Sequence, residues 1–567
     1  MKCVIVAEKP SVARRIREAL REKDIVVASV RGHLMDSEFP EGYGWGECKP
    51  RELFKVREFV DEVRDRKSLM ELRKIFRFCD RLVIATDNDS EGELIGMEIL
   101  KVWRKVNGNR QYMRMRFNST DYNELRRAWR SLEETLNWRW VSKALFRQRF
   151  DLVTGAAFTR LLTGYARRVE GYGGLVSWGS CQSPTLWFIV QRERERLSFK
   201  PRRFWTIRAV LENSSGERFE AESERFWSKD EAEKIYGDVV KTGEAYVEDF
   251  GEEVERDYRP TPLRTDDMLR DLAKITGLPA ARILDLAEEL YAEGYISYPR
   301  TDTNMYKPDF DYAQPLKASC RGLGLHIEAM FNPRQGKLDD GAHTPIYPVS
   351  PYPSDGSLKS RIWEYVARRF LANGFYQDAL RCYRRAEVRI GQLVLRASGS
   401  HTMEPGFYAI YPYFKPEDSP IPSLKKSEEL KIVSLNLHEG STRPPERLTE
   451  PELLKILEEN GIGTDATRAS FPKLVLERGY AVKEGKTFKP TELGMKLIEL
   501  LESIDEKLVT PDTRRMVEEL MAIIDSGGIS YEEALERALR EYEEMFIKLE
   551  DALSARSRSL LSGANQL

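Results

Sequence analysis

The sequence predicts a multi-domain protein: an α/β domain, then β-rich segments around a helical insert, then a mainly helical C-terminal part. Its length of 567 residues is enough for several domains, each with its own core. Over the first 150 residues, short apolar runs alternate with amphipathic stretches, which is typical of a sheet with parallel strands. Helical periodicity is lost over 201–262, and the same strand-like alternation returns at 381–398 and 407–411.

In the first 150 residues we expect three short strands, at 4–7, 26–30 and 81–86. Helices are expected at 11–20 and 92–103, where apolar residues recur at helical spacing. Because strands and helices alternate, the strands are predicted to pair in parallel.

Acidic residues follow two of these strands. Glu8 comes directly after the first strand, and Asp87, Asp89 and Glu91 come after the third. Open α/β sheets bind ligands at the carboxyl ends of their strands. Carboxylates at i, i+2 and i+4 therefore predict a site for Mg²⁺, which prefers oxygen ligands. The alternative interpretation is that Asp87 and Asp89 cap the following helix.

Tyr298 lies where a predicted helix passes into an extended segment. Gly294 suits the left-handed end of the helix, and Pro299 keeps the residue before it extended. Arg300 is two residues further on and points to the same side. A tyrosine hydroxyl has a pKa of about 10, but a nearby guanidinium favours the phenolate and binds phosphate oxygens. The plain alternative is a tyrosine packed at a domain edge.

Strand-like alternation recurs at 204–210, 245–250, 381–398 and 407–411. We expect these pieces to form one β domain that the helical insert interrupts. Near the C-terminus, Thr449 and Glu452 form a capping-box pattern at the start of a helix. A second helix and a hairpin at 484–485 follow, a winged-helix-like layout that suits contacts to the DNA backbone. Two amphipathic helices are expected near 511–525 and 530–556.

The composition excludes several classes of protein. Hydrophobic residues make up 41% and charged residues 32%, as in soluble globular proteins, and no run of about 18 apolar residues predicts a membrane span. The chain opens into a strand, so no signal peptide is expected. The six cysteines are scattered without C-x-x-C spacing, which argues against structural zinc. Gly485-Lys486-Thr487 has Tyr480 where a nucleotide loop needs glycine, so no ATP site is expected.

The string L-Y-A-E-G-Y-I-S-Y-P-R-T-D, residues 290–302, strongly resembles the active-site signature of type IA DNA topoisomerases. Ala7-Glu8-Lys9-Pro10-Ser11 and the acidic run 87–93 resemble the TOPRIM domain of such enzymes. Further motifs follow in the family's order, and they are similar above all to topoisomerase III and to archaeal members of the family. These motifs lie at 147–160, 177–186, 260–265, 341–348, 444–447 and 461–468.

The resemblance implies a role for each matching residue. The implied catalytic residues are Tyr298 as the nucleophile, Glu8, Lys9, Arg300 and His343. The implied metal ligands are Glu8, Asp87, Asp89 and Glu91. The residues expected to contact DNA are His33, Arg147, Ser177, Trp178 as a stacking face, Gln182, Arg447 and Arg468. Three positions depart from the family pattern: Ala292 replaces an acid, and Ser90 and Ser180 each replace an arginine.

The implied fold is a toroid of four domains: a TOPRIM domain at 1–150, a helical base at 151–200 plus 441–567, a β-rich arch at 201–262 plus 376–440, and a tyrosine-bearing domain at 263–375. The implied enzyme breaks one DNA strand through a 5′-phosphotyrosine, passes another strand and reseals the break. It is expected to relax negative supercoils and to decatenate DNA.

The resemblance implies Mg²⁺ as cofactor, without zinc or ATP. We expect a monomer in the cytoplasm, at the nucleoid, that acts on single-stranded or underwound DNA, with a helicase as candidate partner. Two other hypotheses stay open. One is a TOPRIM nuclease or primase that does not use Tyr298, and the other is a non-catalytic scaffold that binds single strands. A reverse gyrase would need a helicase half that this sequence lacks.

Overall fold

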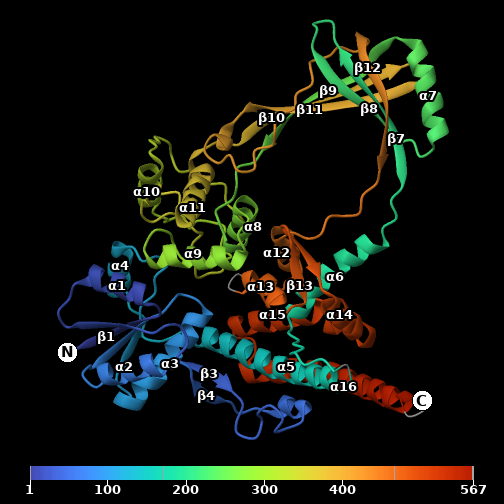
Figure 1. Ribbon diagram of the computed structural model, residues 1–567. Coiled ribbons are helices and arrows are strands. Elements are labelled where there is room, and N and C mark those ends of the chain that lie inside the picture. Colours follow the sequence, from blue (N-terminus) through green and yellow to red (C-terminus); the bar gives the residue numbers. More distant parts are fainter. Residues whose placement is uncertain (1, 170, 465–466, 565–567) are drawn as a thin grey trace.

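The computed structural model describes residues 2–169, 171–464 and 467–564, with side chains described up to residue 558. Figure 1 shows a ring around a wide opening. The base of the ring holds both chain ends, and a curved arm that carries a small β barrel closes it above. Within the described residues, no helix combines the length and the apolar content needed to cross a membrane.

The N-terminal sheet has four parallel strands in the order β2-β1-β5-β6. The bounds of these strands are β1 Cys3–Ala7, β2 Ile25–Ser29, β5 Arg81–Ala85 and β6 Tyr112–Arg114. The three predicted strands are confirmed, whereas β6, with three residues, is too short to give a periodic signal. A small antiparallel pair, β3 (Met35–Glu38) and β4 (Val60–Val63), lies outside this sheet.

Helices cover both faces of this sheet, so every residue of β1 is buried. One face packs against α1 (Pro10–Leu20) and α4 (Tyr122–Arg130). The other face packs against α2 (Arg66–Phe76) and α3 (Ser90–Asn107). Both predicted helices are confirmed, as α1 and α3, and α3 begins directly at the acidic run.

The two strand-rich pieces form a single closed barrel in the order β10-β11-β8-β7-β12-β9. The strands are β7 Arg203–Glu212, β8 Arg218–Ser223, β9 Ala245–Asp257, β10 Ala379–Ile390, β11 Leu393–Glu404 and β12 Glu429–Ser441. Helix α7 (Lys229–Thr242) packs on its outside. The strand expected at 407–411 is wrong: Gly406–Ala409 forms a 3₁₀ helix, and Phe407 and Tyr411 turn into the core.

The insert carries four helices, α8 Thr265–Thr276, α9 Ala280–Ala292, α10 Ala313–Leu323 and α11 Leu358–Phe375. Their apolar side chains share one continuous core with β1, β5, α1 and α4 of the N-terminal sheet. Ile283, Leu286 and Leu290 of α9 are fully or almost fully buried in it, as their helical spacing predicts. The segment that carries Tyr298 is therefore packed directly against the N-terminal α/β domain.

The base is built around α5 (Trp138–Val169), which runs through residue 150, the expected end of the first domain, without a break. Its other elements are α6 Gln182–Ser198, α12 Glu450–Glu459, α13 Phe471–Glu477, β13 Ala481–Glu484, β14 Thr487–Pro490, α14 Glu492–Ile504, α15 Asp512–Ser526 and α16 Tyr531–Ala564. The predicted capping box at Thr449, the hairpin and the two final helices are confirmed.

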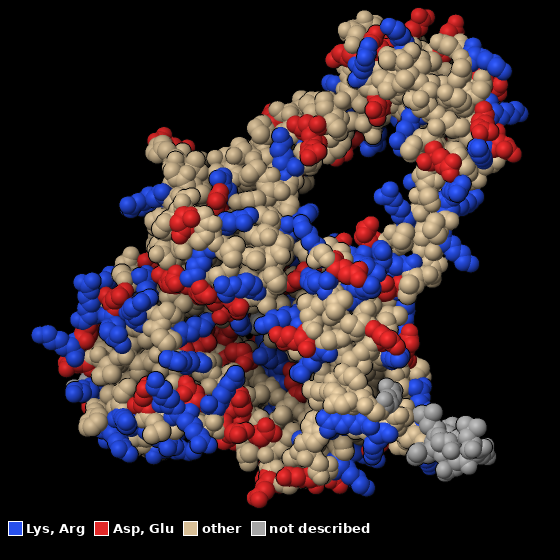
Figure 2. All heavy atoms as spheres, viewed as in Figure 1, with Lys and Arg blue, Asp and Glu red and all other residues tan. Residues whose placement is uncertain are grey.

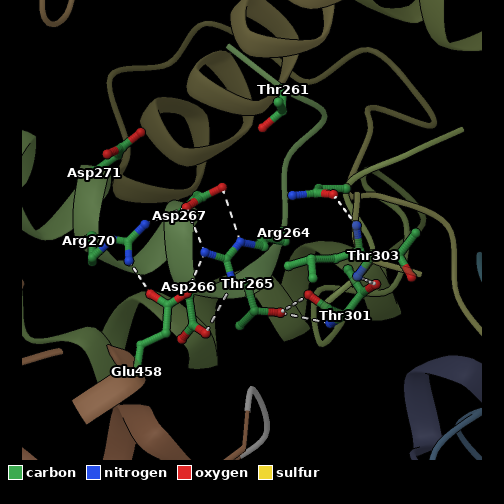
Figure 3. A network of polar contacts seen from close by, with 12 residues as sticks. Thr261, Arg264, Thr265, Asp266, Asp267, Arg270, Asp271, Thr301, Thr303 and Glu458 are labelled. Atoms are coloured by element: carbon green, nitrogen blue, oxygen red, sulfur yellow. Dashed lines mark hydrogen bonds and ion pairs between the residues drawn. The ribbon is translucent and has the colours of Figure 1, made fainter. Parts of the chain in front are cut away.

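A network of charged side chains joins the insert to the base where α8 meets α12 (Figure 3). Glu458 of α12 accepts hydrogen bonds from Arg264, which precedes α8, and from Arg270 within it. Arg468 of the base pairs with Asp266 of α8. All these side chains are mostly shielded from water, so salt screens their attraction less than it screens surface pairs.

The Glu458→Gln variant should loosen this contact, because an amide leaves two shielded guanidinium groups without their shared carboxylate. We expect backbone amides of α8 and α12 to exchange hydrogen for deuterium about tenfold faster or more, a change of roughly 1.4 kcal/mol in the local opening free energy. The matched control is Glu459→Gln, since Glu459 pairs only within α12, with Lys455. Equal exchange in both variants would show that the network does not hold the two domains together.

Candidate active site between the α/β domain and the insert

The Tyr298 side chain lies at the contact between the insert and the N-terminal α/β domain. Helix α9 ends at Ala292, and Gly294 takes the left-handed conformation, with φ of 85°, that turns the chain toward the sheet. The Tyr298 amide then donates to the carbonyl of Asn118 at 2.8 Å. Its ring is 3% exposed, and its hydroxyl donates to Asp89 Oδ2 at 2.5 Å. The insert therefore presents the tyrosine directly to the acidic run.

Two carboxylates of the α/β domain face Tyr298 and its neighbour Tyr291. Asp89 caps α3 by accepting from the Gly92 amide at 2.7 Å, so its capping role is confirmed, and its other oxygen is free to accept from Tyr298. Asp87 accepts from the Tyr291 hydroxyl at 3.2 Å. Although burial opposes ionisation, the hydrogen bonds from Tyr298 and Gly92 hold the pKa of Asp89 below its usual value.

Glu8 completes this acidic group from the end of β1. Its Oε2 accepts from the Asp87 amide at 3.1 Å. Burial, together with the negative charges of Asp87 and Asp89, raises the pKa of Glu8 to about 8. The site thus holds more negative charge than its cations offset.

Two cations lie beside these acids. The Lys9 ammonium is 3.3 Å from Asp87 Oδ2 and 3.1 Å from Glu288 Oε2. The Arg300 guanidinium donates from Nε to Glu288 Oε1 at 2.7 Å. Despite its burial, the negative charges of Asp87 and Glu288 raise the pKa of Lys9 above its usual value.

His343 stacks on the Tyr298 ring, with the ring centroids 5.2 Å apart. Its Nδ1 lies 2.9 Å from Asp340 Oδ2, and this partner holds the pKa of Asp340 well below its usual range despite burial. Burial and the charges of Asp89 and Asp87 raise the pKa of Tyr298 far above its ordinary value, so its hydroxyl is neutral here. The phenol therefore cannot ionise until charge in the site changes.

Glu91 does not join the other acids. Its two oxygens bind Arg147 Nη2 at 2.6 Å and His33 Nε2 at 3.1 Å. Although burial opposes protonation, hydrogen bonds with Glu91 and Glu98 raise the pKa of His33 to about 10, so this imidazole is charged. In the part of the chain that the structure describes, no three His, Cys, Asp or Glu side chains converge where a metal ion could bind. The expected metal group containing Glu91 is thus not preformed.

The position of Trp178 differs from the prediction that its ring is a stacking face for a nucleotide. The indole is 3% exposed, packs against Phe158 and Tyr542, and donates to the Leu508 carbonyl at 2.9 Å. It is a core residue of the base and offers no stacking face to a nucleotide, because its neighbouring aromatic residues already cover it.

Ser177 and Gln182 are also buried, and Gln182 Nε2 donates to the Ser177 carbonyl at 3.1 Å. Both line a cavity of about 450 Å³ that extends to Arg147. Thus Ser177, Gln182 and Arg147 lie along one cavity of the base, which Trp178 also lines, although only 3% of Trp178 is exposed.

The cation expected at position 180 comes from elsewhere in the chain. Arg514 of α15 donates from Nη1 to Ser180 Oγ at 3.0 Å and pairs with Asp151 at 3.2 Å. It lines the same cavity as Ser177 and Gln182. Arg514 thus places a guanidinium beside Ser180, and the sequence gives no signal for it, because Arg514 is 334 residues away.

Two arginines expected to contact DNA are used within the protein instead. Arg447 binds Glu193 from Nε at 2.7 Å and from Nη2 at 2.9 Å, and also pairs with Glu484. Arg468 is buried, where it pairs with Asp266 and donates to the Gly463 carbonyl. Carboxylates within reach satisfy both guanidinium groups, so neither is free for a phosphate in this structure.

Comparison with known proteins agrees with this geometry. Residues 3–120 match the family described as Toprim domain, and residues 135–536 match the family described as DNA topoisomerase. DNA topoisomerase 1 of Archaeoglobus fulgidus is 31% identical, with 99% of this chain and 85% of that protein aligned. DNA topoisomerase 3-beta-1 of Homo sapiens is 30% identical, with 98% of this chain and 70% of that protein aligned.

A solved structure shares the fold. Full-length topoisomerase I from Thermotoga maritima superposes with a TM-score of 0.77 at 23% identity, covering 96% of this chain and 90% of that one. The chain belongs to the DNA topoisomerase family, as an enzyme of type IA with a TOPRIM domain.

Proposed function

We propose that this enzyme cuts a DNA strand by attack of the Tyr298 hydroxyl oxygen on a backbone phosphorus. The new bond is a phosphotyrosine ester to the 5′ end of the downstream fragment, and the 3′ oxygen of the upstream fragment leaves and takes up a proton. One ester replaces another, so resealing needs no nucleotide. The observation that carries this proposal is the hydrogen bond from Tyr298 to Asp89 at the contact between two domains, with Lys9 and Arg300 beside it.

Each neighbour of Tyr298 has a distinct task. Asp89 already accepts the hydroxyl hydrogen bond and is the first acceptor of that proton. Lys9 and Arg300 offset the charge that develops on the phosphoryl oxygens during in-line displacement. His343 holds the ring orientation by stacking. Glu8, buried beside Asp87, is placed to carry a proton toward the leaving 3′ oxygen.

The residues present fit Mg²⁺ as a cofactor. Mg²⁺ is usually held by one or two carboxylates together with water and phosphate oxygens, and Asp87 and Asp89 supply two. Burial raises the pKa of Glu8 and the charges of Asp87 and Asp89 raise it further; a divalent cation would offset those two charges. We infer that Asp87 and Asp89 would hold the ion, while Glu8, which is protonated at neutral pH, keeps the role of proton carrier. When bound, it would polarise a phosphoryl oxygen as a Lewis acid.

We infer four working units: a TOPRIM unit, a β arch, a unit that carries Tyr298, and a helical base with the cavity for a single strand. Figure 2 shows an opening through the molecule with Lys and Arg side chains at its edge, which suits a passing DNA strand. The enzyme would relax negatively supercoiled DNA and decatenate, because an underwound duplex offers the single strand that the site needs. Its setting would be the nucleoid, as a monomer, with a helicase as partner.

The Tyr298→Phe variant should form no covalent adduct with single-stranded DNA, because the attacking oxygen is missing, while non-covalent binding stays within about twofold. The assay incubates labelled oligonucleotide with Mg²⁺ and resolves attached protein on a denaturing gel. Tyr295→Phe is the matched control, since Tyr295 lies three residues earlier, just past the end of α9, and meets Tyr352 edge to face, away from the acids. An adduct in Tyr298→Phe would mean that another residue is the nucleophile, whereas strand cleavage by the unmodified enzyme without any adduct would support a nuclease-type reaction at the same acids.

Changing Asp87 and Asp89 together to Asn should abolish the response of cleavage to Mg²⁺, since both proposed ligands lose their charge. We expect cleavage to fall by about 10²-fold or more at any Mg²⁺ concentration. The control is Asp36→Asn, because Asp36 is half-buried on β3, where it pairs with Arg64, outside the acidic group. A Mg²⁺ titration curve equal to that of the unmodified enzyme would move the metal site elsewhere.

A further inference from the structure

Glu288 is a carboxylate of the site that the proposed mechanism leaves without a role. It lies on α9, one turn before Tyr291, and points toward the α/β domain. Its Oε2 is 3.1 Å from the Lys9 ammonium, and its Oε1 accepts from Arg300 Nε at 2.7 Å and from Arg300 Nη2. Each of its oxygens thus binds one of the two cations proposed to bind the scissile phosphate.

The two cations come from different parts of the molecule. Lys9 follows β1 of the α/β domain, whereas Arg300 follows the nucleophile in the insert. A single carboxylate bridges them across the domain contact, and it is only about one-fifth exposed. Although burial favours its neutral form, Arg300 and Lys9 hold the pKa of Glu288 below its usual value. The bridge is therefore a charged one at neutral pH.

We propose that Glu288 is a positioning residue for strand transfer: it holds Lys9 and Arg300 together across the domain contact, and the scissile phosphate displaces it from them. This inference rests on the proposed function of Tyr298. A phosphate and a carboxylate compete for the same ammonium and guanidinium donors, because both are anionic oxygen acceptors. Glu288 would thus keep the cations in place before DNA binds, at some cost in DNA affinity.

This role predicts two effects of opposite sign in Glu288→Gln. Without the competing carboxylate, both cations are free for phosphate, so single-stranded DNA should bind about threefold more tightly or better. Without the bridge, the cations are less well placed for the reacting phosphate, so single-turnover cleavage at saturating DNA should fall about tenfold or more. A merely structural residue would weaken binding and cleavage together.

The experiment measures binding in the Tyr298→Phe background, so that no adduct forms, and measures cleavage with Tyr298 present. Glu289→Gln is the matched control: Glu289 is the next residue on α9 but pairs with Lys359 at 2.8 Å, outside the site. It should leave both quantities unchanged. Glu288→Asp keeps the charge on a shorter side chain and should restore part of the cleavage rate.

Cleavage by Glu288→Gln at the unmodified rate would overturn the inference, and so would a joint loss of binding and cleavage. The failure of the proposed function would look different, because Tyr298→Phe would then still form an adduct. If Tyr298→Phe forms none and Glu288→Gln cleaves normally, only the role of Glu288 is wrong.

Discussion

The contact between Tyr298 and Asp89 is the constraint on which the active site depends. The hydroxyl belongs to the insert and the carboxylate to the α/β domain, and 209 residues separate them in the sequence. The hydrogen bond exists only while the insert is packed against the sheet. The shared core of α9, α11 and the first face of the sheet supplies that packing. Separation of the two domains would therefore take the nucleophile away from its acids, as passage of a strand through the ring requires.

The electrostatics of the site explain how a buried tyrosine is kept unreactive until DNA arrives. Burial and the neighbouring carboxylates favour the neutral phenol, and Lys9 and Arg300 are engaged by carboxylates of the protein. A phosphate that enters the site changes both conditions, because it recruits the cations and brings the reacting centre to the hydroxyl. The site is built for an anionic substrate rather than for an isolated acid–base step.

Local sequence patterns predicted much of this arrangement. The parallel sheet, the acids after β1 and β5, and the fixed exit of Tyr298 from α9 follow from periodicity, glycine and proline within short windows. The sequence could not show that Trp178 and Arg468 are buried, because their partners, Leu508 and Asp266, are distant in sequence and only folding brings them close. Arg514 was missed for the same reason, since it is 334 residues from Ser180. Glu288 was missed because an acidic residue on a helix is usually solvated.

The most direct test of this account is the polarity of the covalent adduct. A single-stranded oligonucleotide labelled at its 5′ end, and the same one labelled at its 3′ end, are cleaved with Mg²⁺ and trapped with denaturant. We expect the protein to stay attached to the 3′-labelled fragment through Tyr298, identified by peptide mass, and the 5′-labelled fragment to carry an extendable 3′ hydroxyl. Attachment to the 5′-labelled fragment, or through another residue, would contradict the account.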